Sequence, residues 1–300
     1  MYINAKLDMP KQKQNNHIPV LIDEVIDVLK PKVSDTYLDL TAGYGGHASK
    51  ILSLTKAGAV LVDRDPSAIT DLQLTFKARN ISIVQSDFLE ASRQLVAEGK
   101  TFDMILADLG VSSPHLDIRA RGFSIKHDGP LDMRMDQQQK LTAAVVVNTY
   151  SEQDLTRILR EYGEEPKARR IASLIVEHRP FETTQQLANI VAKAWPGYSR
   201  VHPATRTFQA IRIAVNDELG QLTQSLSLWL KLLNPGGRLC VISFHSLEDA
   251  VVKRFFKEHG GDRYDAELDI LTNRPLSASE NELVFNPRAR SARLRASKRK

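Results

Sequence analysis

The first hundred residues alternate between short apolar runs and stretches in which apolar residues recur at helical spacing. Residues 20–30 (VLIDEVIDVLK) place apolar side chains on one helix face, whereas residues 37–40 (YLDL) form an apolar run typical of a buried strand. The same alternation predicts further strands at 59–62, 81–84 and 102–107, and helices at 46–54, from Pro66 to about Ala78, and near 91–97. Strands separated by helices build right-handed βαβ units, so the pattern predicts an α/β fold with a doubly wound, mostly parallel sheet.

This rhythm stops after the fourth strand. The sequence that follows is turn-rich and then helical, with no run that reads as a strand. The α/β pattern then returns as a long helix, a strand and a helix, at 207–233, 238–243 and 247–259. The simplest interpretation is one α/β domain, residues 1–114 and 208–300, interrupted by a helical insertion at 115–207. We expect the insertion to leave the sheet at the carboxyl ends of its strands, where open α/β folds bind ligands.

The first predicted strand runs directly into a glycine-rich loop, Thr41-Ala-Gly-Tyr-Gly-Gly-His47. Glycines there let the backbone turn tightly and approach a ligand without interference from a Cβ atom. Asp63 ends the second predicted strand, where an acid is placed to accept hydrogen bonds from ribose hydroxyls. The segment from Gly43 to Ala48 also satisfies the dinucleotide fingerprint G-x-G-x-x-G/A, so a nicotinamide-dependent dehydrogenase is the competing interpretation.

Three further features favour S-adenosylmethionine over a dinucleotide. Asp39 precedes the loop in the pattern D-x-x-x-G-x-G, typical of methyltransferases, and its carboxylate suits the ammonium of a methionine group. Asp87 and Phe88 follow the third strand, where an acid and a ring suit adenine, and Asp108 ends the fourth strand. Several carboxylates around one crevice attract a cationic sulfonium ligand and repel a pyrophosphate. Asp87 on its own is equally well explained as the N-cap of the next helix.

Longer strings, spread in order over nearly the whole chain, carry a more specific resemblance. They are His17-Ile-Pro-Val-Leu, Asp39-x-Thr-x-Gly-x-Gly-Gly-His47, Asp63-Arg-Asp-Pro66, Asp108-Leu-Gly-Val-Ser-Ser-Pro114, Arg121-Gly-Phe-Ser124, Asp128-Gly-Pro-Leu-Asp-Met-Arg-Met-Asp136, Tyr162-Gly-Glu-Glu165, His202-Pro-Ala-Thr-Arg-Thr-Phe-Gln-Ala-Ile-Arg-Ile213, Ser243-Phe-His-Ser-Leu-Glu-Asp249 and Asn286-Pro-Arg-Ala-Arg-Ser291. With these strings the chain resembles the ribosomal RNA small-subunit methyltransferase H family (MraW type). The resemblance implies a Rossmann-like class I methyltransferase that uses S-adenosylmethionine to methylate the exocyclic N4 of a cytosine in the decoding region of 16S rRNA.

The resemblance also implies which residues bind the cofactor. Carried over position by position, they are Gly45, Gly46, His47, Asp63, Phe88 and Asp108. The family has one further cofactor contact, a glutamine directly after Ser-Ser-Pro, where this chain has His115. A histidine can still donate or accept a hydrogen bond through a ring nitrogen, but its reach differs. The family also commonly has arginine in the glycine loop where this chain has Tyr44.

Methylation of a cytosine amine sets requirements on the acceptor side of the site. The enzyme must orient a poorly nucleophilic amine and accept a proton as the amine becomes cationic. The segment after the fourth strand usually does this, which makes Ser113 or its backbone the candidate catalytic group. Phe123 and Phe244 are candidates for stacking on the base, with a core position as the alternative for both. Methylation at cytosine C5 is the rival chemistry, but it requires a cysteine nucleophile, and the single cysteine, Cys240, lies mid-strand among apolar residues, which excludes it.

The charge distribution points to the kind of substrate. The formal net charge is +5, yet residues 287–300 hold seven Arg or Lys and no acid, and the rest of the chain carries 34 bases against 36 acids. Such a basic C-terminal tail favours a phosphate backbone, with a disordered solubilising tail as the alternative. In and just after the insertion lie Arg119, Arg121, Arg134, Arg169, Arg170, Arg179, Arg206 and Arg212. We assign the insertion to substrate recognition, with ion pairs inside a helical bundle as the alternative.

The remaining composition bounds the location and the partners. No apolar run reaches the ~18–20 residues needed to span a bilayer, and the N-terminal segment lacks the apolar stretch of a secretory signal. We therefore expect no membrane contact and a cytoplasmic location. One cysteine excludes an intramolecular disulfide or a cysteine-cluster metal site, and we expect no metal. The expected partner is 16S rRNA or the small ribosomal subunit, and both a monomer and a homodimer are compatible with the sequence.

Overall fold

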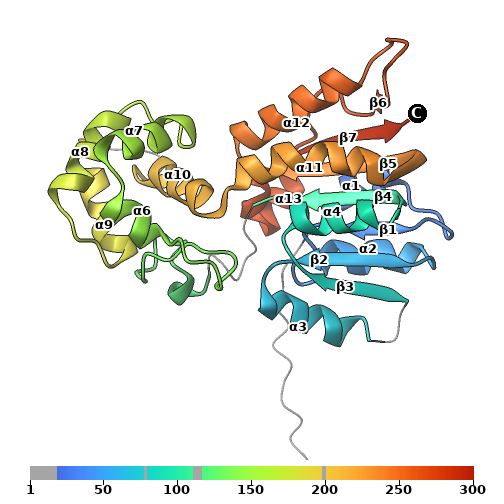
Figure 1. The fold of residues 1–300 in the computed structure, drawn as a ribbon, viewed down its shortest axis with the longest axis horizontal. Helices are drawn as coiled ribbons and strands as arrows, with labels where there is room; N and C mark the ends of the chain where they lie inside the picture. The colour runs from blue at the N-terminus through green and yellow to red at the C-terminus, as the bar shows by residue number, and fades with distance from the viewer. Residues whose placement is uncertain (1–18, 78–79, 111–116, 198–200) are drawn as a thin grey trace, which may run out of the picture.

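The computed structural model describes residues 19–77, 80–110, 117–197 and 201–300, and Figure 1 shows an α/β part beside a group of helices. The strands are β1 (Tyr37–Asp39), β2 (Ala59–Asp63), β3 (Ile81–Gln85), β4 (Phe102–Asp108), β5 (Leu233–Ser243), β6 (Leu268–Ile270) and β7 (Arg293–Arg299). The α/β part also contains α1 (Ile22–Leu29), α2 (Gly46–Leu54), α3 (Pro66–Thr75), α4 (Phe88–Ala97), α11 (Glu218–Leu232), α12 (Ser246–His259), α13 (Glu280–Phe285) and the 3-10 turn η2 (Pro287–Ser291). The elements expected in the first hundred residues are all present, with ends shifted by a few residues.

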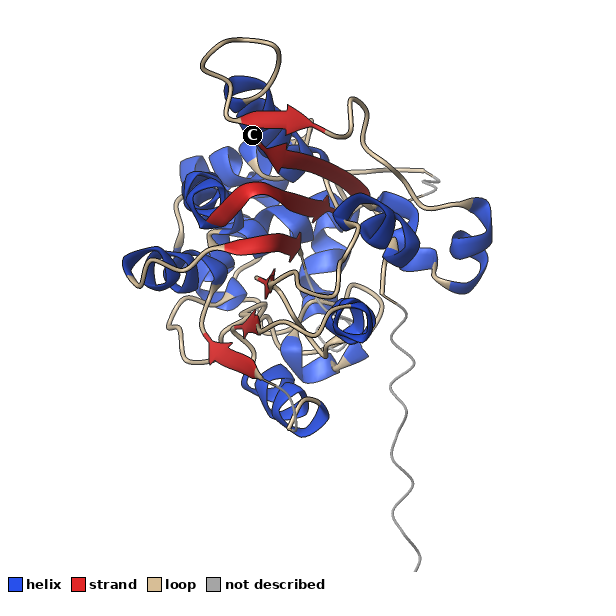
Figure 2. Ribbon diagram, turned by 90° about the vertical axis from the view of Figure 1, so that its right-hand side faces the viewer, coloured by secondary structure: helices blue, strands red, loops and turns tan. Residues whose placement is uncertain are grey.

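The strands form a single sheet in the order β3-β2-β1-β4-β5-β7-β6. The pairs β1–β2, β2–β3, β1–β4 and β4–β5 are parallel, and β7 is antiparallel to both β5 and β6. Figure 2 shows this continuous layer of strands with helices around it. The predicted doubly wound, mostly parallel sheet is confirmed. Because the strand order reverses at β1 and β4, the carboxyl ends of these two strands open a crevice.

Helices cover both faces of the sheet because its strands are apolar on both sides. On one face α1 and α3 bury Val25 and Leu72 in the same cluster as strand residues. On the other face α11 and α12 bury Trp229 and Phe256. The indole N–H of Trp229 donates to the Ser92 hydroxyl on α4 (3.0 Å), so this buried polar atom has a partner. No helix within the described ranges is long and apolar enough to cross a membrane.

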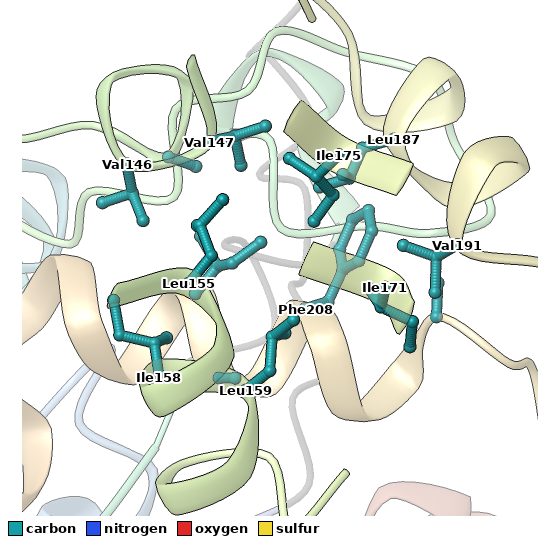
Figure 3. Close-up of a cluster of buried hydrophobic side chains, with 14 of the residues drawn as sticks. Val146, Val147, Leu155, Ile158, Leu159, Ile171, Ile175, Leu187, Val191 and Phe208 are labelled. Atoms are coloured by element: carbon teal, nitrogen blue, oxygen red, sulfur yellow. The ribbon is translucent and has the colours of Figure 1, made fainter. Parts of the chain in front are cut away.

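The second group of helices packs around a hydrophobic core of its own. Its elements are η1 (Arg119–Arg121), α6 (Ala143–Thr149), α7 (Glu152–Glu161), α8 (Ala168–Glu177), α9 (Thr184–Ala192) and α10 (Thr205–Asn216). The buried members of this core all lie between Phe123 and Val215. Figure 3 shows Leu155, Ile171 and Phe208 among the side chains that converge there. The helices inserted after β4 therefore bury their apolar faces against one another rather than against the sheet.

The prediction of a single long helix at 207–233 is wrong. The chain forms two helices there, α10 and α11, which meet at Asp217 in a left-handed conformation with φ 49°. Aspartate tolerates this conformation better than most residues. Helix α10 contributes Phe208 and Ile211 to the helical core, whereas α11 contributes Trp229 to the sheet core. We therefore propose that the insertion extends through α10 instead of ending at residue 207.

The expectation of a basic tail at residues 287–300 is also wrong. This segment forms η2 and then β7, which lies inside the sheet between β5 and β6. Leu294 and Ala296 are fully buried, and the guanidinium of Arg295 donates to both carboxylate oxygens of Asp249 on α12 (2.6 and 3.1 Å). The charge count was misleading because Ala292, Leu294 and Ala296 alternate with Arg293 and Arg295, which is the pattern of a strand.

Candidate active site

The glycine loop between β1 and α2 needs its glycines for steric reasons. Gly45 has a φ of 79°, and a Cβ atom there would lie 2.9 Å from the Phe76 ring. The N–H of Gly43 donates to Asp63 Oδ2 (2.8 Å), so the carboxylate after β2 fixes the loop after β1. The other oxygen, Asp63 Oδ1, accepts from the N–H of Asp65 (2.8 Å). These bonds join the two loops into one corner at the carboxyl ends of the strands.

A cavity of about 850 Å³ opens at this corner, a size that suits a small-molecule ligand. Its lining includes six residues that the family resemblance assigned to the cofactor, namely Gly45, Gly46, His47, Asp63, Phe88 and Asp108. Ser113 and His115 lie outside the described residues. The structure thus brings the described candidates to one cavity, and their contact with a cofactor stays a prediction.

Asp39 does not line this cavity, so the structure gives no support to a contact with a ligand ammonium. Asp39 is 1% exposed, and its carboxyl group accepts hydrogen bonds from the Tyr37 hydroxyl (2.7 Å) and the Thr41 N–H (3.2 Å). Burial outweighs both hydrogen bonds and raises the pKa of Asp39 to about 7. Asp39 therefore supports the start of the glycine loop from inside the protein.

Asp87 and Phe88 line the cavity from the start of α4. Asp87 is the N-cap of this helix, because its Oδ1 accepts from the N–H groups of Leu89 and Glu90 (2.9 Å each). The Phe88 ring packs edge-on against Trp229, with ring centroids 5.8 Å apart. Asp87 thus has the capping role that was the alternative interpretation, and the Phe88 ring is a fixed apolar part of the cavity wall.

His47 and Asp108 form a polar pair in the cavity wall, with His47 Nδ1 3.7 Å from Asp108 Oδ2. His47 Nε2 lies 2.8 Å from the Val20 carbonyl oxygen, which fixes the proton on Nε2 and turns Nδ1 towards Asp108. Asp108 Oδ1 is buried and has no hydrogen-bond partner among the described residues. Burial, together with the negative charges of Asp39 and Glu248, raises the pKa of Asp108 well above its ordinary value. A buried carboxyl group with an unused oxygen is suited to bind a polar ligand atom.

A second wall of the cavity comes from the start of α12 and the residues before it. Phe244, one of the two candidates for base stacking, lines the cavity, and a Cβ atom on Gly110 would lie 3.3 Å from its ring. Glu248 also lines the cavity, and its Oε2 accepts from the N–H groups of Phe244 (2.8 Å) and His245 (3.3 Å). Burial raises the pKa of Glu248, but the hydrogen bond of His245, the charge of Arg212 and the hydrogen bond from the Phe244 N–H outweigh it and hold that pKa below its ordinary value. Glu248 is therefore a charged carboxylate at the cavity.

Several lining residues were not singled out from the sequence as site residues. They are Glu218, Leu222, Glu248, Met135 and the segment from Phe285 to Arg288. Glu248 and Asn286 lie in strings that carry the family resemblance, which was the one signal available for them. Phe123, the other stacking candidate, is buried in the helical core instead, as its alternative interpretation predicted.

Most of the insertion's arginines have structural partners. Arg121 pairs with Asp65 (2.9 Å) where both side chains are buried, and Arg134 pairs with Asp132 (2.7 Å). Arg212 pairs with Glu218, and Arg179 and Arg206 donate to backbone carbonyls. Arg119, Arg169 and Arg170 are exposed. The structural alternative thus accounts for Arg121, Arg134, Arg179, Arg206 and Arg212, and Arg119, Arg169 and Arg170 keep the assignment to substrate recognition open.

Glu218, His245 and Glu248 bring potential metal-ligand atoms within 4.8 Å of one another. Both oxygens of Glu218 already accept hydrogen bonds from Arg212 (2.9 and 2.8 Å). The ring of His245 is engaged as well, because its Nδ1 accepts from the Glu248 N–H (3.4 Å), which leaves the proton on Nε2. We assign this group to the charge network that orients Glu248, and we assign no metal to it.

The strand order, the glycine loop after β1 and the acids after β2 and β4 define a class I methyltransferase. More narrowly, the chain belongs to the MraW methylase family, whose family model matches residues 14–300. It is 48% identical over 291 residues to the ribosomal RNA small subunit methyltransferase H of Synechocystis sp., covering 93% of this chain and 92% of the relative. It is 44% identical over 305 residues to the protein of the same name from Halothermothrix orenii, covering 94% and 98%. A solved putative rRNA-methylase from Clostridium thermocellum aligns with a TM-score of 0.47 and 12% identity over 94% of this chain and 99% of that chain, an overlap too weak to carry functional weight.

Proposed function

We propose that the protein transfers a methyl group from S-adenosylmethionine to the exocyclic N4 of a cytosine in the decoding region of 16S rRNA. The observation that carries this proposal is family membership over residues 14–300, because the relatives of that length are named ribosomal RNA small subunit methyltransferase H. The acid-lined cavity agrees with a cationic cofactor.

The chemistry of the cavity lining fits S-adenosylmethionine better than a dinucleotide. The lining contains two arginines, Arg64 and Arg288, and a larger number of acidic side chains, at Asp63, Asp71, Asp87, Asp108, Glu218 and Glu248. The acidic side chains favour a ligand that carries an ammonium and a sulfonium, and they disfavour the pyrophosphate of a nicotinamide cofactor. Bound there, S-adenosylmethionine supplies an electrophilic methyl group.

The cofactor side of the proposed site follows the family resemblance. We propose Gly45, Gly46, His47, Asp63, Phe88, Asp108 and His115 as the residues that hold the cofactor. The positive φ of Gly45 and the Phe76 ring behind it keep the loop backbone at the cavity surface. Phe88 offers an apolar face. Both carboxylate oxygens of Asp63 lie beside the glycine loop, where we propose that the ribose binds.

The acceptor side must orient the amine and receive its proton. Ser113, or its backbone, remains our proposed acceptor. Asp108 Oδ1 and the charged Glu248 add carboxylate oxygens on the described walls of the cavity, to which an amine N–H can donate. The Phe244 ring, which lines the same cavity, is our proposed surface for the target base.

A product analysis tests the site of methylation. The purified protein, S-adenosylmethionine and unmodified small ribosomal subunits are incubated, and the digested RNA is analysed by mass spectrometry. We expect N4-methylcytidine from the wild type and from Cys240→Ser. Cys240 is fully buried in β5, and burial raises the pKa of its thiol far above the ordinary value, so it is unsuited to attack a base. The recovery of 5-methylcytidine, or a folded but inactive Cys240→Ser protein, would overturn the assignment.

We further propose that the substrate is 16S rRNA within the small ribosomal subunit, and that the protein works in the cytoplasm. The insertion of helices after β4 supports a role in substrate recognition, because it leaves the sheet at the edge where the cavity opens. Incubation with naked 16S rRNA in parallel with small subunits distinguishes the two substrates. Sedimentation of the protein alone determines whether it is a monomer or a homodimer.

A further inference from the structure

An aromatic side chain stands exposed at the cavity and does not pack into the core. Phe285 is the last residue of α13, and 76% of its surface is exposed. It lines the cavity together with Asn286, Pro287 and Arg288. The neighbouring Val284 is 73% exposed. Exposed apolar side chains at the edge of a cavity mark a contact surface, because their burial by a partner is favourable.

The segment that carries this ring is tied down on both sides. Glu282 Oε1 accepts from the N–H of Leu21 (2.9 Å), which attaches α13 to the start of α1. Asn286, directly after the ring, is 8% exposed, and Ala289 is fully buried in the core beneath the sheet. The exposure of Phe285 is thus a fixed feature of the surface, set by buried neighbours.

Positive charge follows the ring directly. Arg288 and Arg290 in η2 are exposed. The Arg288 guanidinium donates to Asp117 at the start of the helical region (2.6 Å), so this segment spans from the sheet to the insertion. A ring for base stacking beside guanidinium groups for phosphates is the combination with which proteins hold single-stranded nucleic acid.

We propose that Phe285, with the exposed Arg290, forms a stacking platform for a nucleotide adjacent to the target cytosine. This inference rests on the proposed function, because it requires an RNA substrate. A base that enters the cavity must leave its stack, and its neighbour then loses a stacking partner. The exposed Phe285 ring offers that neighbour a new face. Since every base has such a face, the platform adds affinity without reading sequence.

The test measures binding and not methylation. Phe285→Ala, Phe285→Trp and Tyr264→Ala are compared for their affinity to unmodified small ribosomal subunits and to a fluorescent single-stranded RNA containing one cytosine. Tyr264 is the matched control, because it is a fully exposed aromatic residue outside the cavity lining. We expect Phe285→Ala to weaken RNA binding roughly 5- to 150-fold, as the loss of one base–aromatic stack does. Phe285→Trp should bind like the wild type, and Tyr264→Ala should leave the affinity unchanged.

An abasic nucleotide on either side of the cytosine sharpens the test. It should weaken binding by the wild type and have little further effect on Phe285→Ala. Equal affinities of Phe285→Ala and Tyr264→Ala would overturn the proposal. A loss of S-adenosylmethionine affinity in Phe285→Ala would also overturn it, because the ring would then be a cofactor contact. A change in the sedimentation of Phe285→Ala would overturn it as well, because the ring would then be a contact between two copies of the chain. Failure of the wild type to methylate RNA instead counts against the proposed function, and the two failures are separate readouts.

Discussion

The two walls of the cavity are built in different ways. One wall is formed where β1, β2, β3 and β4 end: Asp63 and Asp108 are the last residues of β2 and β4, and Gly45 lies in the loop after β1. The other wall brings together the starts of α11 and α12 and the segment after α13, which are far apart along the chain. Cofactor-binding chemistry can thus be read next to predicted strands, whereas acceptor-binding chemistry depends on how the later elements pack.

The largest expected effect is on the free energy of unfolding, and it concerns the ion pair that attaches α12, part of the second cavity wall, to β7. Arg295 on β7 pairs with Asp249, the residue after Glu248 on α12, and both side chains are buried. Replacement of Arg295 by Met leaves a buried carboxylate without its main partner, which costs about 3–5 kcal/mol. We expect chemical denaturation of Arg295→Met to show a loss of this size in the free energy of unfolding.

Arg290→Met is the matched control, since Arg290 lies in the same basic run but is exposed. Its effect on the free energy of unfolding should stay within about 0.5 kcal/mol. If the two variants were equally stable, the Arg295–Asp249 pair would not contribute to stability, and residues 287–300 would not be held in the sheet.

The next effect concerns the first wall. Asp63→Ala removes the acceptor for the Gly43 and Asp65 N–H groups and the proposed ribose contact. We expect calorimetry to show S-adenosylmethionine binding weakened by ~1.5–3 kcal/mol, with RNA affinity unchanged. Asp71→Ala, which removes an acid from the same cavity lining, is the control and should have a smaller effect. Unchanged cofactor affinity in Asp63→Ala would move the ribose site elsewhere.

A pH-dependent effect concerns Asp39, which supports the start of the glycine loop from inside the protein. The folded-state pKa of Asp39, about 7, lies above the ordinary value of 3.8, so folding favours the protonated form. Its contribution to stability is complete below about pH 4 and is lost as the pH rises through about 7. Asp39→Asn removes this titration. The melting temperature of the variant relative to the wild type should therefore rise between pH 5 and pH 8. Each kcal/mol of stability that the wild type loses over this range should add ~2–4 °C to the difference.

Asp23→Asn, at an exposed acid in the first turn of α1, serves as the comparison for this pH series. If the melting temperatures of Asp39→Asn and the wild type differed by a constant amount across the series, Asp39 would be charged throughout in the folded protein.

The sequence was sufficient for the strands up to β4, because short apolar runs between amphipathic helices have few alternative folds. It was also sufficient for the clustering of Gly45, Asp63 and Asp108, since parallel strands end at the same edge of a sheet. It was insufficient for β7, because the seven charges of residues 287–300 concealed the alternation of Leu294 and Ala296 with polar residues. The cavity wall that contains Glu248 and Phe285 could not be predicted from hydrophobic periodicity, because only tertiary packing brings these residues together.

The position of the insertion has a consequence for how fast the molecule assembles. Met104 on β4 lies beside Arg238 on β5, and the whole helical region separates them along the chain. Contacts within that region are local, so its helices can associate early, whereas joining the two halves of the sheet requires closure of a very long loop. Refolding is therefore expected to gain most of its helix signal before the sheet is complete. The acceptor wall of the cavity, which belongs to the late half, forms last.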